Sequence, residues 1–80
     1  KSAPYLVVIR FEAEKKEEVE LALGSLKKLK VKSKTASAGI IELCLEARFT
    51  PETLSLVESL SAIPGVLNAS AVSYGGETTL

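Results

Sequence analysis

The spacing of apolar residues changes repeatedly along this chain, and the order of those changes constrains the fold more than any other feature. Four segments alternate between faces with a period of two, as β-strands do, and two segments repeat apolar residues at three- and four-residue steps, as amphipathic helices do. The expected strands are residues 5–11, 29–35, 40–49 and 66–74, and the expected helices are residues 16–28 and 51–63. The order is therefore strand, helix, strand, strand, helix, strand.

This order predicts an α+β fold, a ferredoxin-like βαββαβ sandwich of the ACT-like kind. Right-handed crossovers place the first and third strands in the centre of a four-stranded antiparallel sheet, with both helices on one face. We expect residues 1–80 to form one such domain. The chain begins at Lys1 and contains no methionine, so we also expect it to be a piece excised from a longer protein.

The apolar faces of the expected elements indicate which residues form the core. One face of the first strand is wholly apolar, and the expected third strand presents its odd-numbered residues inward. The helix over residues 51–63 begins with Thr50-Pro51-Glu52, a capping residue followed by a proline suited to the first turn. Its predicted apolar stripe is Leu54, Val57 and Leu60.

The second and third strands are expected to pair as a hairpin, with Thr35 opposite Ile41. This register keeps apolar residues on one face, because a one-residue slip would turn every side chain over. It places Lys34 opposite Glu42 and Lys30 opposite Glu46, which are favourable charge pairs. The lysines on the second strand also suit a sheet edge, where they discourage pairing between molecules.

The composition argues against catalysis, metal binding and nucleic-acid binding. The chain has no histidine and a single cysteine, Cys44, so the usual catalytic triads and clustered zinc ligands cannot be assembled. Glu42 and Glu46 lie on the same strand face but ~13 Å apart at ~3.3 Å per residue, too far to share one ion. Ten basic and ten acidic residues give no net charge that would attract nucleic acid. We expect no enzyme activity, no catalytic or metal-binding residue and no cofactor.

Three stretches carry a resemblance to known proteins: VKSKT at residues 31–35, IELCLEAR at 41–48 and IPGVLNASAVSYGGE at 63–77. Together they resemble the soluble C-terminal domain of an uncharacterised family of small bacterial membrane proteins. The layout also resembles ACT domains, including the ACT-like tail of MgtC-type membrane proteins. The resemblance implies a domain at the cytoplasmic face of the membrane, soluble in itself, which regulates or assembles the membrane protein that carries it. No catalytic residue carries over.

The sheet face away from the helices is the expected interface. Its candidate residues are Leu6, Val8, Ile40 and Cys44, joined by Val66 and Val72 where the even-numbered residues of the last strand face outward. The other outward set of that strand is Leu67, Ala69 and Ala71. The face is more apolar than a monomer needs, so we expect a homodimer, formed either face to face or by edge pairing of the last strand into a longer sheet. The first functional hypothesis is a non-catalytic regulatory or oligomerisation domain of a bacterial membrane protein with a role linked to transport. The alternative is a small-molecule-sensing ACT domain attached to a metabolic enzyme. Residues 13–16 lack the loop pattern of ACT domains that bind amino acids.

Overall fold

The computed structural model describes residues 4–24, 26, 29–48 and 50–73. Their elements follow the predicted order, with a short 3-10 turn before the first helix. The bounds are β1 Pro4–Glu12, η1 Ala13–Lys15, α1 Lys16–Leu23, β2 Lys30–Ser37, β3 Ile40–Arg48, α2 Pro51–Ser61 and β4 Val66–Ser73. The predicted ends at residues 28, 49 and 74 lie outside the described residues.

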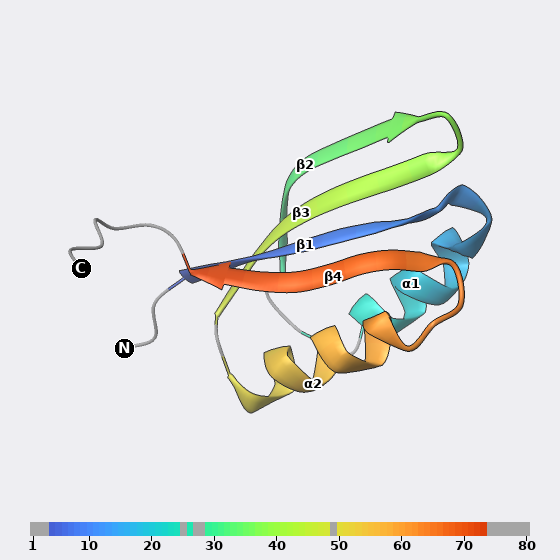
Figure 1. The fold of residues 1–80 in the computed structure, drawn as a ribbon. Helices are drawn as coiled ribbons and strands as arrows, with labels where there is room; N and C mark the ends of the chain where they lie inside the picture. The colour runs from blue at the N-terminus through green and yellow to red at the C-terminus, as the bar shows by residue number, and fades with distance from the viewer. Residues whose placement is uncertain (1–3, 25, 27–28, 49, 74–80) are drawn as a thin grey trace.

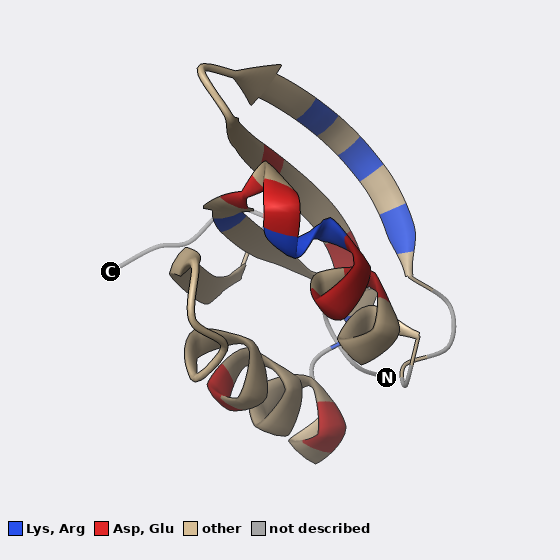
Figure 2. Cartoon of the chain, turned by 90° about the vertical axis from the view of Figure 1, so that its right-hand side faces the viewer, with Lys and Arg blue, Asp and Glu red and all other residues tan. Residues whose placement is uncertain are grey.

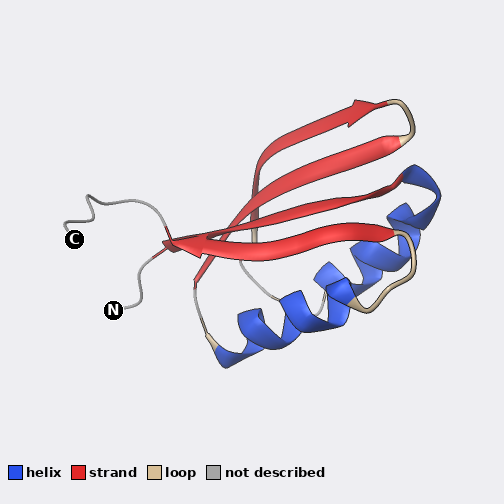
Figure 3. Ribbon diagram, in the orientation of Figure 1, coloured by secondary structure: helices blue, strands red, loops and turns tan. Residues whose placement is uncertain are grey.

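The strands form one sheet in the order β2-β3-β1-β4, in which all neighbours are antiparallel. Both helices lie against one face of this sheet (Figure 1), and none of the described residues forms a helix over the other face (Figure 3). The fold is the predicted α+β, ferredoxin-like sandwich with two central strands and two edge strands. The sheet therefore has one face covered by the helices and one open face.

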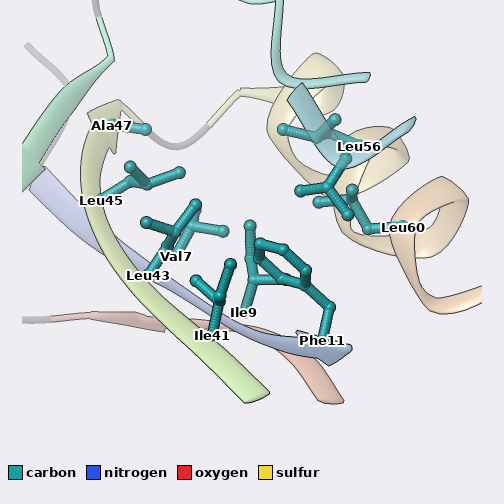
Figure 4. Close-up of a cluster of buried hydrophobic side chains, with 10 residues drawn as sticks. Val7, Ile9, Phe11, Ile41, Leu43, Leu45, Ala47, Leu56 and Leu60 are labelled. Atoms are coloured by element: carbon teal, nitrogen blue, oxygen red, sulfur yellow. The ribbon is translucent and has the colours of Figure 1, made fainter. Parts of the chain in front are cut away.

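The core lies between the sheet and the helices. The fully buried side chains of β1 are Val7, Ile9 and Phe11, which confirms the predicted inward face of that strand. Figure 4 shows these side chains and those of β3 pointing toward Leu56 and Leu60 of α2. The whole buried cluster is Val7, Ile9, Phe11, Val19, Ile41, Leu43, Leu45, Ala47, Leu56 and Leu60.

The start of α2 follows the prediction, and its predicted stripe is confirmed at Leu60, which is buried, and at Val57, which packs against the core, but not at Leu54. Thr50 caps the helix, because its Oγ1 accepts a hydrogen bond from the Thr53 backbone N–H at 3.2 Å. The predicted core residue Leu54 is 48% exposed, whereas Leu56 is buried. The first turn of the stripe was misplaced because a polar residue is buried there: Thr53 is buried, and its hydroxyl donates to the Arg48 carbonyl oxygen at 2.6 Å.

The β2–β3 hairpin has a different register near its turn from the one predicted. Ala38 and Gly39 both have positive φ, 54° and 78°, as in a two-residue type I′ turn. This turn pairs Ser37 with Ile40, so Thr35 lies opposite Glu42 and Lys34 opposite Leu43. The predicted pairs of Thr35 with Ile41 and of Lys34 with Glu42 are therefore wrong.

An irregularity between Val31 and Ser33 then restores the predicted pair of Lys30 with Glu46. The tip of the hairpin can carry a slipped register because every residue of β2 is exposed, so the slip buries no charge.

A similar irregularity in β4 moves one of the predicted interface residues to the covered face. The register of β4 against β1 shifts between Arg10 and Phe11, which sets Asn68 opposite Arg10 but Val66 opposite Phe11. Val66 consequently packs against the core. Its predicted outward position is wrong, because Leu67 is the extra residue of the shifted strand and reverses the alternation at that point.

Candidate interaction surface on the open face of the sheet

The strand register arranges the side chains of the open face in rows that cross all four strands. Residues that pair directly on neighbouring strands point to the same side of the sheet. Starting from β4, the rows are Val72, Leu6, Glu46 and Lys30; then Ser70, Val8, Cys44 and Ser33; then Asn68, Arg10, Glu42 and Thr35. We call these twelve residues the outer face.

Four of the predicted interface residues come together in the first two rows of the outer face. Leu6 and Val8 of β1 and Cys44 of β3 are half-buried by their neighbours, and Val72 of β4 is 49% exposed. Ile40 lies on the same side at the start of β3, opposite Glu12 and beyond the row of Arg10. Four of the six predicted interface residues therefore form one apolar patch, with Ile40 apart from it and Val66 on the covered face.

Some charged side chains of the outer face form ion pairs and others do not. Lys32, at the irregularity of β2, places its Nζ 3.5 Å from Glu46 Oε1. Arg10 and Glu42 are direct neighbours on β1 and β3, both exposed. Within the part of the chain that the structure describes, the ion pairs are Lys32 with Glu46 and Lys15 with Glu18, so neither Arg10 nor Glu42 has an ion-pair partner.

Cys44 lies between Val8 and Ser33 in the middle row and is a free, half-buried thiol. A reactive thiol needs a nearby cation that stabilises the thiolate. Lys32, a cation on the neighbouring strand β2, instead contacts Glu46. Among the described residues, no three Cys, Asp or Glu side chains are grouped closely enough to hold a metal ion. The surroundings of Cys44 are those of a small packing residue.

The formal charge of zero conceals a separation of charge across the molecule. In Figure 2, most acidic residues lie on the helices, where a basic segment at the start of α1 accompanies them, whereas three basic residues follow one another along β2. These are Lys30, Lys32 and Lys34, all of them exposed. The apolar residues of the outer face lie on β1, β3 and β4, on the side of the sheet opposite the helices.

Two depressions formed by described residues lie outside the outer face. A groove of about 460 Å³ runs between the helices and is lined mainly by small and apolar side chains, with Glu52 as its charged residue. A second depression of about 490 Å³ lies beside the loop after β1, where Glu12 and Glu14 meet the turn at Gly39. Two carboxylates at this loop disfavour a ligand that carries its own carboxylate.

No helix in the described part of the chain is both long and apolar enough to cross a bilayer. No protein-family model matches the chain. No curated protein matches it either. Solved structures, in contrast, include several that share its fold.

The chain is similar to the C-terminal domain of the MgtC protein from Mycobacterium tuberculosis, with 20% identity, a TM-score of 0.69, and coverage of 91% of this chain and 88% of that one. It is similar to the ACT domain of a GTP pyrophosphokinase from Chlorobium tepidum, with 14% identity, a TM-score of 0.66, and coverage of 90% and 100%.

A homoserine dehydrogenase from Thiobacillus denitrificans contains a similar region, with 8% identity and a TM-score of 0.65. The match covers 91% of this chain but 17% of the dehydrogenase. Likenesses at such low identity establish the fold. The chain therefore has the ACT-like form of the ferredoxin-like fold, which it shares with an MgtC C-terminal domain and with an ACT domain of an enzyme.

Proposed function

We propose that this chain is a non-catalytic regulatory and assembly domain of a bacterial membrane protein with a role linked to transport, and that it works by pairing with a second copy through the outer face. The observation that carries the proposal is the apolar patch of Leu6, Val8, Cys44 and Val72 on the open face of the sheet. Such a patch is typical of an interaction site.

The size of the outer face supports a weak, specific dimer. Nine residues of β1 at ~3.3 Å each span about 30 Å, and four strands ~4.8 Å apart span about 19 Å. Each face then covers roughly 570 Å², and two faces together bury roughly 1,100 Å², just above the ~1,000 Å² that a specific interface needs. Two copies of the membrane protein would be brought together when their domains pair, at the cytoplasmic face of the membrane.

The membrane setting rests on the fold shared with the C-terminal domain of the MgtC protein. The fold shared with the ACT domain of a GTP pyrophosphokinase supports the alternative, a small-molecule sensor attached to a metabolic enzyme. Glu12 and Glu14 at the loop after β1 count against an anionic ligand such as an amino-acid carboxylate. The assembly role is therefore the better supported of the two.

Sedimentation velocity across micromolar concentrations tests the assembly role. The wild-type chain should show a mass that rises from monomer to dimer, and Val8→Lys should remain a monomer, because a lysine in the middle row would have to lose its hydration in the interface. Leu21→Lys is the matched control, since Leu21 is 80% exposed on α1, away from the sheet. It should dimerise like the wild type.

A wild-type chain that stays monomeric would reject the assembly role and leave ligand sensing as the better interpretation. A Val8→Lys chain that dimerises normally would show that a different surface is used. Circular dichroism of each variant checks that the fold is kept.

A further inference from the structure

Arg10 and Glu42 are the charges of the outer face on its two central strands that have no ion-pair partner among the described residues. They pair directly across the central strands β1 and β3, and both side chains are exposed. Glu46, in contrast, already contacts Lys32. An arginine and a carboxylate that are neighbours without forming an ion pair are available to a partner, and the guanidinium group can bind a carboxylate through two parallel hydrogen bonds.

We propose that Arg10 of each copy pairs with Glu42 of the other in a face-to-face homodimer, and that these two ion pairs fix how the copies are aligned. The inference rests on the proposed function, because it specifies the partner and the register of that same surface. The two-fold axis runs parallel to the strands and passes between β1 and β3.

This axis follows from the order of the strands. Rotation about it exchanges β1 with β3 and β4 with β2, so all four strands of one copy cover all four strands of the other. Each row stays level with itself. Arg10 then lies over Glu42 of the second copy, and Val8 lies over Cys44 of the second copy, each contact occurring twice. In the first row, Leu6 lies over Glu46 of the second copy and Val72 lies over Lys30 of the second copy. The full face is covered, as an interface of about 1,000 Å² requires.

The other symmetric arrangements satisfy fewer of these conditions. An axis across the strands, through the middle row, would set Glu42 over Glu46 of the second copy, and like charges that face each other in an interface are costly. An axis between β1 and β4 would set Leu6 over Val72 of the second copy, but only those two strands would overlap. That overlap halves the buried area to roughly 550 Å², below the range of specific interfaces.

Charge reversal provides the test, by sedimentation velocity on the whole chain. Arg10→Glu places a carboxylate over Glu42 twice, and Glu42→Arg places a guanidinium over Arg10 twice, so each variant alone should dimerise at least about tenfold more weakly than the wild type. An equimolar mixture of the two variants restores opposite charges at both contacts and should form a heterodimer of wild-type affinity. Glu58→Arg, at an exposed position of α2, is the control and should leave dimerisation unchanged.

Two results would overturn the charge pairing while leaving the proposed function intact. The first is normal dimerisation of both reversal variants while Val8→Lys is monomeric, as the axis between β1 and β4 would give. The second is a mixture that stays monomeric although circular dichroism shows both variants folded. If either reversal prevents folding, Arg10→Gln and Glu42→Gln replace the pair, and each must still weaken the dimer. A monomeric wild type would reject the proposed function and the pairing together.

Discussion

At the scale of single residues, Gly65 occupies a position where both the backbone conformation and a close contact disfavour any larger side chain. Its φ is 95°, and its carbonyl oxygen accepts a hydrogen bond from Glu12 N–H at 2.9 Å. A Cβ at this position would lie 2.6 Å from Lys15 Cγ. Gly65→Ala should therefore lower the free energy of unfolding by more than about 1 kcal/mol, from strain and from displacement of the lysine.

Gly39→Ala separates these two causes. Gly39 also has a positive φ, 78°, but a Cβ there would meet nothing within 4 Å. Urea unfolding of both variants should show a larger loss for Gly65→Ala than for Gly39→Ala. Equal losses would mean that the contact with Lys15 costs nothing and that backbone strain alone explains both.

At the scale of elements, the β2–β3 turn is a position where the sequence is poorly matched to its conformation. A type I′ turn needs positive φ at both central residues, which asparagine and glycine adopt most readily. Ala38 adopts a φ of 54° at the first of them. Ala38→Asn should therefore stabilise the chain by about 0.5 kcal/mol, and Ala38→Val should destabilise it, as measured by thermal unfolding. No difference between the two variants would contradict a type I′ turn.

The same elements show which parts of the fold can be predicted from sequence. The first strand was predicted correctly because its odd residues, from Tyr5 to Phe11, are uniformly apolar on a strand that is central in the sheet. The register of the hairpin was not, because its turn, at Ala38 and Gly39, lacks the asparagine or aspartate that usually marks a type I′ turn. An exposed strand offers no hydrophobic pattern that could decide the register instead.

The candidate surface was predictable to the same extent. Leu6, Val8 and Cys44 belong to regular stretches of central strands, so simple alternation places them on the open face. Val66 was misplaced because the register shift beside Phe11 has no marker in the sequence. The lack of an ion-pair partner for Arg10 and Glu42 was also beyond prediction. It depends on the register, which places Lys34 opposite Leu43, and on the ion pair of Lys32 with Glu46.

At the scale of the whole molecule, pairing and stability should be coupled. A chain of eighty residues removes only ~60% of its unfolded surface from water, so its stability is small and any interface adds an appreciable part. A dimer present at about ten times its dissociation constant gains roughly 1 kcal/mol, which raises the Tm of a domain of this size by about 4–8 °C. The Tm of the wild-type chain should therefore rise with protein concentration.

Calorimetry of Val8→Lys over the same concentrations supplies the comparison for this coupling. Its Tm should be independent of concentration, and should equal the wild-type value at high dilution, because the substitution lies on the outer face and removes nothing from the core. Leu21→Lys should keep the concentration dependence of the wild type. An interface on the outer face exists only when all four strands are paired in register, so dimerisation there must stabilise the folded sheet. If sedimentation shows a dimer but the wild-type Tm is also independent of concentration, the two copies associate without stabilising the sheet. The contact between them then lies elsewhere.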